Sequence, residues 1–201
     1  MIDVLLAEDH EMVREALASL LDLEPDLRVV GSAGCGAEAL AMAGRLRPDV
    51  AVLDVAMPAP DGIEVVERLP RVAPDCRAVL VTGHGRPGQV RRALRAGAHG
   101  FLRKESPAAA LAHAIRVVHG GRTWVEPELL ADTLGSERCP LTPRELEALR
   151  LAADAESVTA IARRMGLSVG TVRNHLSSAI GKLGAANRHV AVRIATDRGW
   201  L

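Results

Sequence analysis

The feature that most constrains the fold is an alternation of short apolar runs with helical patterns along the first 120 residues. The five apolar runs are rich in Val, Leu and Ile, as is typical of strands buried on both faces. Such alternation predicts βα units whose parallel strands form one sheet covered by helices on both sides. The expected strands are residues 2–8, 27–33, 49–54, 77–82 and 99–104, and the expected helices are 10–21, 36–46, 62–69, 87–96 and 106–119.

Three segments follow from this pattern. Residues 1–119 fit an α/β domain, a flavodoxin-like, doubly wound, five-stranded parallel sheet with strand order 2-1-3-4-5. Residues 120–140 resemble a linker, opened by Gly120-Gly121 and containing a short helix. Residues 141–201 show no strand pattern, and we expect an all-α domain of four helices at about 143–153, 157–165, 169–183 and 187–198.

Helix-start and turn signals support the all-α domain. Thr142, Pro143 and Glu145 form the pattern of a capping box with Pro at the first helical position. Ser168 is a candidate N-cap for the third helix. A short turn containing Gly166 precedes that longer, basic helix, and this order is typical of a helix-turn-helix whose second helix enters the major groove of DNA.

Charge is divided unevenly along the chain, although its formal net charge is zero. Residues 1–120 carry 14 Lys and Arg against 16 Asp and Glu, whereas residues 157–201 carry 7 against the single Asp197. A basic C-terminal module predicts an anionic partner, with nucleic acid the usual candidate.

Features of exported or membrane proteins are not found in the sequence. The three cysteines form no CxxC motif, and the N-terminal segment lacks the basic region of a signal peptide. No apolar run approaches the roughly 18 residues that span a bilayer. We therefore expect a cytoplasmic protein with no membrane partner.

Polar side chains stand where the predicted strands end. Glu8 and Asp9 follow the first strand, and Asp54, Thr82 and Lys104 end the third, fourth and fifth. These ends lie side by side in the order 2-1-3-4-5, so the five side chains should converge on one pocket. Three carboxylates together repel one another and favour a hard divalent cation such as Mg²⁺. The predicted metal-binding residues are Glu8, Asp9, Asp54 and Ala56, the last through its backbone carbonyl.

Asp54, at the centre of the predicted pocket, is suited to act as a carboxylate nucleophile that becomes an aspartyl phosphate. Mg²⁺ would neutralise phosphoryl oxygens, and Lys104 and the Thr82 hydroxyl would contact the remaining ones. The chain has 23 arginines and two lysines, Lys104 and Lys182. A lysine at 104 suits a tight pocket better than a guanidinium fork would.

Residues 1 to about 118 resemble a bacterial response-regulator receiver domain. The resemblance rests on LLAEDH with Glu8 and Asp9, on LDVAMP with Asp54, on Thr82, and on FLRK with Lys104. It implies that Asp54 is the phosphoacceptor and that Phe101 is the switch aromatic, whose ring moves with the Thr to report phosphorylation. A plain core position for Phe101 is equally compatible with the sequence.

The loops near the pocket depart from the commoner receiver pattern at Ala59-Pro60, where a Gly followed by an apolar residue is frequent. Receivers tune dephosphorylation through the side chains two positions beyond the phosphoacceptor and two beyond the Thr. The resemblance thus leads to the hypothesis that Ala56 and His84 set the phosphate lifetime.

Residues 141–201 resemble the LuxR-type helix-turn-helix domain of NarL/FixJ regulators, through LTPRELEAL, VTAIARRMGLS and SVGTVRNHLSSAIGKLGAANR. Val172, Leu176, Ile180 and Leu183 share one helix face and should be core. By family position, Arg173, Asn174 and Ser177 are candidates for reading bases. The candidates for phosphate contacts are Thr171, His175 and Lys182, with Arg188 a further possibility; a structural role for His175 is also open.

The resemblance implies a two-component transcriptional regulator that takes a phosphoryl group from a sensor histidine kinase onto Asp54 and then binds promoter DNA as a homodimer. On this interpretation the protein is not an enzyme beyond incidental autophosphatase activity. A phosphatase of the haloacid-dehalogenase type is disfavoured because Ala56 stands where a second Asp is needed. A DNA-binding regulator that acts independently of phosphorylation is the remaining alternative.

Overall fold

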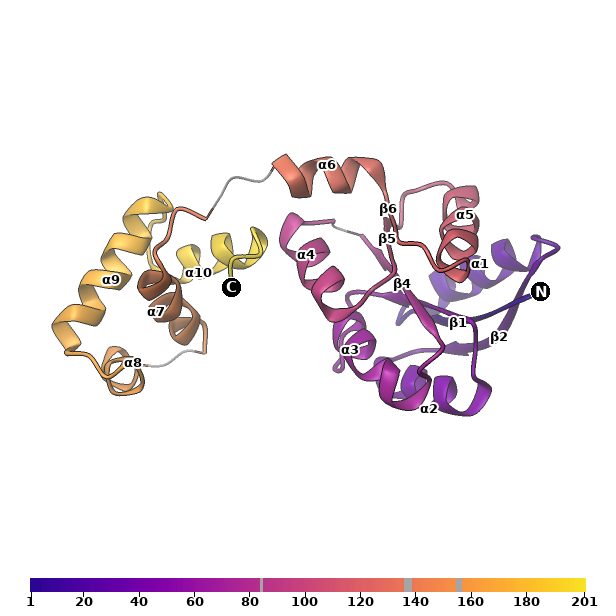
Figure 1. Ribbon diagram of the computed structural model, residues 1–201, viewed down its shortest axis with the longest axis horizontal. Coiled ribbons are helices and arrows are strands. Elements are labelled where there is room, and N and C mark those ends of the chain that lie inside the picture. Colours follow the sequence, from indigo (N-terminus) through magenta and orange to yellow (C-terminus); the bar gives the residue numbers. More distant parts are fainter. Residues whose placement is uncertain (84, 136–138, 155–156) are drawn as a thin grey trace. The chain divides into compact units, whose positions relative to one another are not determined.

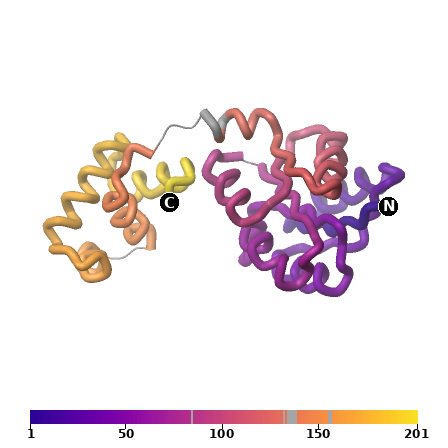
Figure 2. Tube along the Cα trace, viewed as in Figure 1, coloured from indigo at the N-terminus to yellow at the C-terminus, as the bar shows by residue number. Residues whose placement is uncertain are grey.

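The computed structural model describes residues 1–83, 85–135, 139–154 and 157–201 of the chain. The chain divides into two compact units, each with its own hydrophobic core (Figures 1 and 2). The first unit comprises Met1–Gly85 and Val90–Ala131, and the second comprises Arg86–Gln89 and Asp132–Leu201. Within the described residues, no helix combines the length and the apolar character needed to cross a membrane.

The sheet of the first unit is parallel throughout, with its strands in the order β2-β1-β3-β4-β5-β6. The expected doubly wound α/β fold is therefore confirmed, as is the order 2-1-3-4-5 of the five predicted strands. The strands are β1 (Ile2–Ala7), β2 (Leu27–Ala33), β3 (Val50–Asp54), β4 (Arg77–Thr82), β5 (Gly100–Arg103) and β6 (Trp124–Val125).

The prediction of five strands is wrong in one respect, because β6 adds a sixth strand from the segment expected to be linker. It pairs in parallel with β5, with Gly100 opposite Trp124 and Phe101 opposite Val125. Two residues are too few to produce an alternation or an apolar run, so the sequence pattern carries no strand signal there. The open edge of β5 supplies the hydrogen-bonding groups that make the short strand favourable.

Helices cover both faces of the sheet (Figure 1). One core cluster lies between the sheet and α2, α3 and α4, and the other lies between the sheet and α1 and α5. Every residue of β3 is buried, as its unbroken apolar run predicts for a central strand covered on both sides. The helices are α1 (Glu11–Asp22), α2 (Gly36–Leu46), α3 (Gly62–Val72), α4 (Pro87–Ala96) and α5 (Ala108–His119), followed by α6 (Pro127–Gly135).

The second unit contains the four expected helices, α7 (Pro143–Ala153), α8 (Val158–Met165), α9 (Val169–Lys182) and α10 (Arg188–Asp197). The capping box at Thr142 is present: the Thr142 side chain accepts from the amide of Glu145, and the Glu145 carboxylate accepts from the amide of Thr142. Gly166 ends α8 in the left-handed conformation, with φ of 66°, which glycine adopts without steric cost. The Ser168 side chain caps α9.

Candidate functional site

Side chains from three strand ends meet at the carboxyl edge of the sheet. Glu8 follows β1, Asp54 ends β3 and Lys104 follows β5. The Lys104 ammonium nitrogen lies 2.7 Å from a carboxylate oxygen of Glu8 and 3.1 Å from Oδ2 of Asp54. Both carboxylates are almost fully buried. The structure thus brings together three of the residues that the strand ends predict to converge.

Thr82 belongs to the same edge. It is buried at the end of β4, and its carbonyl accepts the hydrogen bond of the Lys104 amide at 2.8 Å. The register places Asp54 opposite Val81 and Thr82 opposite Arg103. The backbone pairing of β3, β4 and β5 therefore sets the spacing of the phosphoacceptor candidate, the hydroxyl and the lysine.

Asp9 lies at the rim of this site, partly exposed, with His10 beside it. His10 Nδ1 is 2.9 Å from Oδ1 of Asp9 and 3.3 Å from Oε1 of Glu8. Ligand atoms of Glu8, Asp9 and His10 all lie within 4.8 Å of one another. His10 is not among the residues predicted from the strand ends, although it directly follows the acidic pair Glu8-Asp9 in the sequence.

One carboxylate oxygen of the site has no hydrogen-bond partner in the part of the chain that the structure describes. Among the residues that the structure describes, Asp54 Oδ1 is a buried side-chain oxygen with no hydrogen bond. A buried acceptor left in that state is costly, at roughly 1–3 kcal/mol. The oxygen donor set of Glu8, Asp9 and Asp54 is of the kind that Mg²⁺ prefers, so these residues fit a hard divalent cation.

Lys104 is held in its charged form by its neighbours. Burial by itself would lower the pKa of the ammonium group. The hydrogen bonds and charges of Glu8 and Asp54 outweigh burial, so the pKa of Lys104 is raised above its ordinary value. The pocket therefore keeps a fixed positive charge next to the Asp54 carboxylate at any physiological pH.

The turn after β3 bends sharply because α3 begins directly against it. A Cβ on Gly62 would lie 2.1 Å from the backbone carbonyl oxygen of Asp54, so only glycine allows this approach. The Asp61 side chain caps α3 and is 3.1 Å from the guanidinium of Arg92 on α4. Ala56 is exposed within this turn, where its carbonyl is expected to bind the cation. His84, the other residue assigned to phosphate lifetime, lies outside the described residues.

Phe101 is fully buried in the core cluster beneath α3 and α4, together with Leu80, Val90 and Leu129. This is the core position that the sequence left open as one of two interpretations. A role as switch aromatic stays a prediction.

The helix α9, which the sequence predicts to contact DNA, has an apolar and a polar face. Val172 and Leu176 are buried in the core of the second unit, and Ile180 and Leu183 pack partly buried against it. The base-reading candidates Arg173, Asn174 and Ser177 are all exposed, whereas Thr171 and His175 are half-buried. The hydroxyl of Thr171 lies 2.8 Å from that of the N-cap Ser168.

Lys182 has a contact that the sequence pattern did not foresee. Its ammonium nitrogen donates at 2.8 Å to the buried carboxylate of Glu145 on α7, and Ser178 donates to the same group at 2.6 Å. Burial alone would raise the pKa of Glu145, but the bonds from Lys182, Ser178 and Thr142 outweigh it and bring the pKa to about 2. This carboxylate joins α9 to α7. The predicted phosphate contact of Lys182 stays a prediction.

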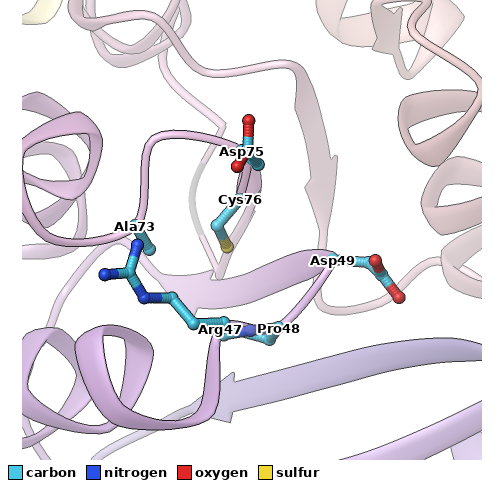
Figure 3. Close-up of a pocket in the computed structure, with 6 residues that line it drawn as sticks. All are labelled: Arg47, Pro48, Asp49, Ala73, Asp75 and Cys76. Atoms are coloured by element: carbon cyan, nitrogen blue, oxygen red, sulfur yellow. The ribbon is translucent and has the colours of Figure 1, made fainter.

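A separate cavity of about 270 Å³ lies at the amino-terminal ends of β3 and β4, away from the carboxylate cluster (Figure 3). The nucleophile candidate in its lining is the thiol of Cys76, whose pKa burial raises to about 12. A thiol in that state is unreactive near neutral pH. The cavity is lined by Arg47, Pro48, Asp49, Ala73, Asp75 and Cys76.

Comparisons with known proteins agree with both units. Residues 4–116 match the family model of the response regulator receiver domain, and residues 139–195 match that of bacterial regulatory proteins of the luxR family. The chain is 41% identical over 200 residues to the transcriptional regulatory protein DesR of Bacillus subtilis (strain 168), covering all of this chain and 99% of DesR. It is 36% identical to the DNA-binding transcriptional activator DevR/DosR of Mycobacterium tuberculosis, covering 98% and 95% of the two chains.

Solved structures give the same result over the whole length. The response regulator ChrA of a heme-sensing two-component system is 32% identical, with a TM-score of 0.59, over 100% of this chain and 98% of ChrA. The response regulator RcsB in complex with DNA is 25% identical, with a TM-score of 0.72, over 98% of both chains. The phosphoacceptor-type sheet edge, the helix-turn-helix unit and these matches together show that the chain is a two-component response regulator of the NarL/FixJ family, a receiver domain followed by a LuxR-type DNA-binding domain.

Proposed function

We propose that the protein is switched by phosphorylation of Asp54 and then binds promoter DNA as a homodimer. The observation that carries the proposal is the buried carboxylate of Asp54, with Oδ2 beside Lys104 and Oδ1 without a hydrogen bond among the described residues. Oδ2 lies beside the Lys104 ammonium group, which could bind a phosphoryl oxygen. Oδ1 could bind a metal ion or form the bond to phosphorus.

In the proposed reaction, a carboxylate oxygen of Asp54 attacks the phosphorus of a phosphohistidine on the partner kinase. The new bond is P–O to Asp54, the P–N bond to the imidazole breaks, and the released imidazole takes up a proton from solvent. Lys104 compensates the developing charge on a phosphoryl oxygen. The Thr82 hydroxyl contacts a second oxygen.

Mg²⁺ is the cofactor we infer, held by Asp9, Asp54 and the carbonyl of Ala56, with Glu8 next to them. Bound there, the ion would neutralise phosphoryl oxygens during transfer. Glu8 keeps its own contact with Lys104. The Lys104 ammonium nitrogen lies 3.1 Å from Oδ2 of Asp54, within reach of a phosphoryl group formed on that carboxylate.

DNA binding is assigned to the exposed face of α9. Arg173 can pair with guanine and Asn174 with adenine by two hydrogen bonds each, while Thr171, His175 and Lys182 contact phosphates. A family relative, RcsB, is known in complex with DNA. A symmetric pair of such helices on two half-sites would compensate for the modest charge of one copy.

Footprinting tests the proposal against phosphorylation-independent DNA binding. Protection of a DNA site selected from a random pool is measured for the wild-type chain and for Asp54→Asn, each with and without acetyl phosphate and Mg²⁺. We expect acetyl phosphate with Mg²⁺ to lower the protein concentration at which the wild-type chain protects the DNA. The variant should show no such change, because its carboxamide cannot form the acyl phosphate. Equal protection in all four samples would instead establish the phosphorylation-independent regulator.

A further inference from the structure

Glu126 is a buried carboxylate that the proposed phosphoryl transfer does not use. It stands directly after β6 and accepts hydrogen bonds from the Arg103 amide at 3.0 Å, from the Arg103 side chain at 3.1 and 3.2 Å, and from the Ser106 hydroxyl at 2.9 Å. Burial would raise the pKa of this group, but the bonds from Arg103 and Ser106 prevail and lower it. These bonds favour the ionised form of Glu126 and engage both of its oxygens.

The two donors of Glu126 lie on either side of Lys104. Arg103 is the last residue of β5, and Ser106 is two residues beyond Lys104, so Glu126 fixes both ends of the short segment that carries the lysine. Inside that segment the Lys104 amide is held by the Thr82 carbonyl. Glu126 thus holds the residues on both sides of Lys104, whose side chain extends to Glu8 and Asp54.

Glu126 is itself held by the edge of the sheet. Its amide donates to the Phe101 carbonyl at 3.0 Å, which continues the pairing of β6 with β5. Three residues further along, Leu129 of α6 is buried in the core cluster that contains Phe101. A Cβ on Gly85 would lie 2.1 Å from a methyl carbon of Leu129, so α6 packs tightly on the loop that follows Thr82. Glu126 and Leu129 thus place the segment from β6 into α6 against Ser106 on one side and Gly85 on the other.

An exposed ion pair alone would explain little of this arrangement, because such pairs contribute little to stability. Glu126 differs in that it is buried and accepts from a backbone amide as well as from side chains. Groups that act on a reacting centre need this kind of support to hold their geometry.

We propose that Glu126 is a positioning residue for Lys104 in the phosphorylation of Asp54, an inference that rests on the proposed function. By reciprocity, phosphorylation that draws Lys104 toward the new phosphoryl group acts back on Glu126 and on the start of α6. The short sixth strand then links the phosphoacceptor site to the segment that leads toward the DNA-binding unit.

The test compares Glu126→Gln with Glu128→Gln in the full chain. Glu128 is a matched control because it is two residues away, 66% exposed, and 3.9 Å from the same guanidinium of Arg103. Phosphorylation by acetyl phosphate with Mg²⁺ is followed by intact-protein mass spectrometry. We expect E126Q to react about tenfold more slowly, within the range typical of coupling between sites. E128Q should react at the wild-type rate, and Mg²⁺ affinity should stay unchanged in both because the cation ligands are untouched.

Hydrogen exchange at the Lys104 amide supplies a readout that needs no phosphorylation. Faster exchange in E126Q than in E128Q and the wild type supports the positioning of Lys104, and equal exchange overturns it. If the wild type takes up no phosphoryl group, the proposed function fails while the exchange result still decides the inference. An E126Q chain that reacts at the wild-type rate contradicts the inference. The inference is also contradicted if the phosphorylation rate, the Mg²⁺ affinity and the melting temperature of E126Q all fall together, because that result indicates a structural role alone.

Discussion

Two buried carboxylates, Glu145 and Asp54, differ in how completely their oxygens are hydrogen-bonded. Glu145 accepts hydrogen bonds at both oxygens, from Lys182, Ser178 and the Thr142 amide. Asp54 has Lys104 at one oxygen, while the other has no hydrogen bond among the described residues. A satisfied buried anion stabilises a helix contact, whereas an incompletely satisfied one is costly and stays ready for a ligand.

Replacement of Lys182 should expose the structural role of Glu145. We expect Lys182→Ala to lower the free energy of unfolding of the helical unit by about 2 kcal/mol, since it leaves a buried carboxylate with one partner fewer. Urea unfolding followed by Trp200 fluorescence in a Trp124→Phe background measures this. Arg193→Ala, a change at an exposed position on α10, is the control and should leave the unfolding midpoint unchanged.

The stability of the helical unit measured in this way should depend on pH. The pKa of Glu145 is about 2 in the folded state against an ordinary value of 4.5, so its stabilising contribution is complete above pH 4.5 and is lost as the pH falls toward 2. Stability of the helical unit should decline across that window. Lys182→Ala should make the decline smaller. An unchanged pH profile in that variant would mean that Lys182 does not hold the carboxylate in its ionised form.

At the scale of elements, α9 packs into the core with one face and leaves its opposite face exposed. Val172 and Leu176 anchor the helix in the core, and Glu145 of α7 fixes its last turn through Lys182. Arg173, Asn174 and Ser177 stay exposed on the other face. A rigid helix that is held at both its middle and its end can present side chains in one register to base edges.

Arg173→Ala should therefore reduce sequence preference more than overall affinity. A bidentate arginine contact with guanine contributes about 1–3 kcal/mol of discrimination, so the ratio of affinities for selected and random DNA should fall roughly tenfold or more. Fluorescence anisotropy on both DNAs at one fixed salt concentration measures that ratio. Arg163→Ala, an exposed change on α8, is the matched control. An equal loss on both DNAs for Arg173→Ala would assign Arg173 to phosphate contact instead.

On the scale of the whole molecule, the two units have separate hydrophobic cores. The first unit buries its apolar residues on the two faces of the sheet, and the second buries its own between four helices. Ligands that bind only one folded unit stabilise only that unit, by an amount set by their concentration relative to Kd. We therefore expect a ligand of one unit to raise the melting temperature of that unit and to leave that of the other unchanged.

Calorimetry of the full chain should show this separation as two transitions. Mg²⁺ should raise the melting temperature of one transition, because we propose that it binds the carboxylates of the sheet edge, and should leave the other unchanged. At a concentration about a hundred times Kd, the stabilisation should be about 2.7 kcal/mol. Asp54→Ala should reduce the Mg²⁺-dependent shift. A single transition that moves as a whole would show that the units unfold together.

The sequence by itself determined the order of the elements and the residue types at the strand ends. Apolar runs separated by helical patterns admit few folds, and the order of parallel strands brings Glu8, Asp54 and Lys104 to one edge. The capping box at Thr142 and the buried face of α9 were also predictable, because they depend on contacts within one helix or on its periodicity.

Only the tertiary structure decided the rest. The strand β6, the pairing of Lys182 with Glu145 and the engagement of Glu126 with Arg103 join residues more than 20 positions apart. No local pattern encodes such contacts, since they arise when an open strand edge or a buried charge takes whichever partner the packing of the whole chain brings near. Local periodicity thus set the helices and strands of the chain, and the requirement to satisfy buried polar groups set how the segments around Lys104 and Lys182 are held.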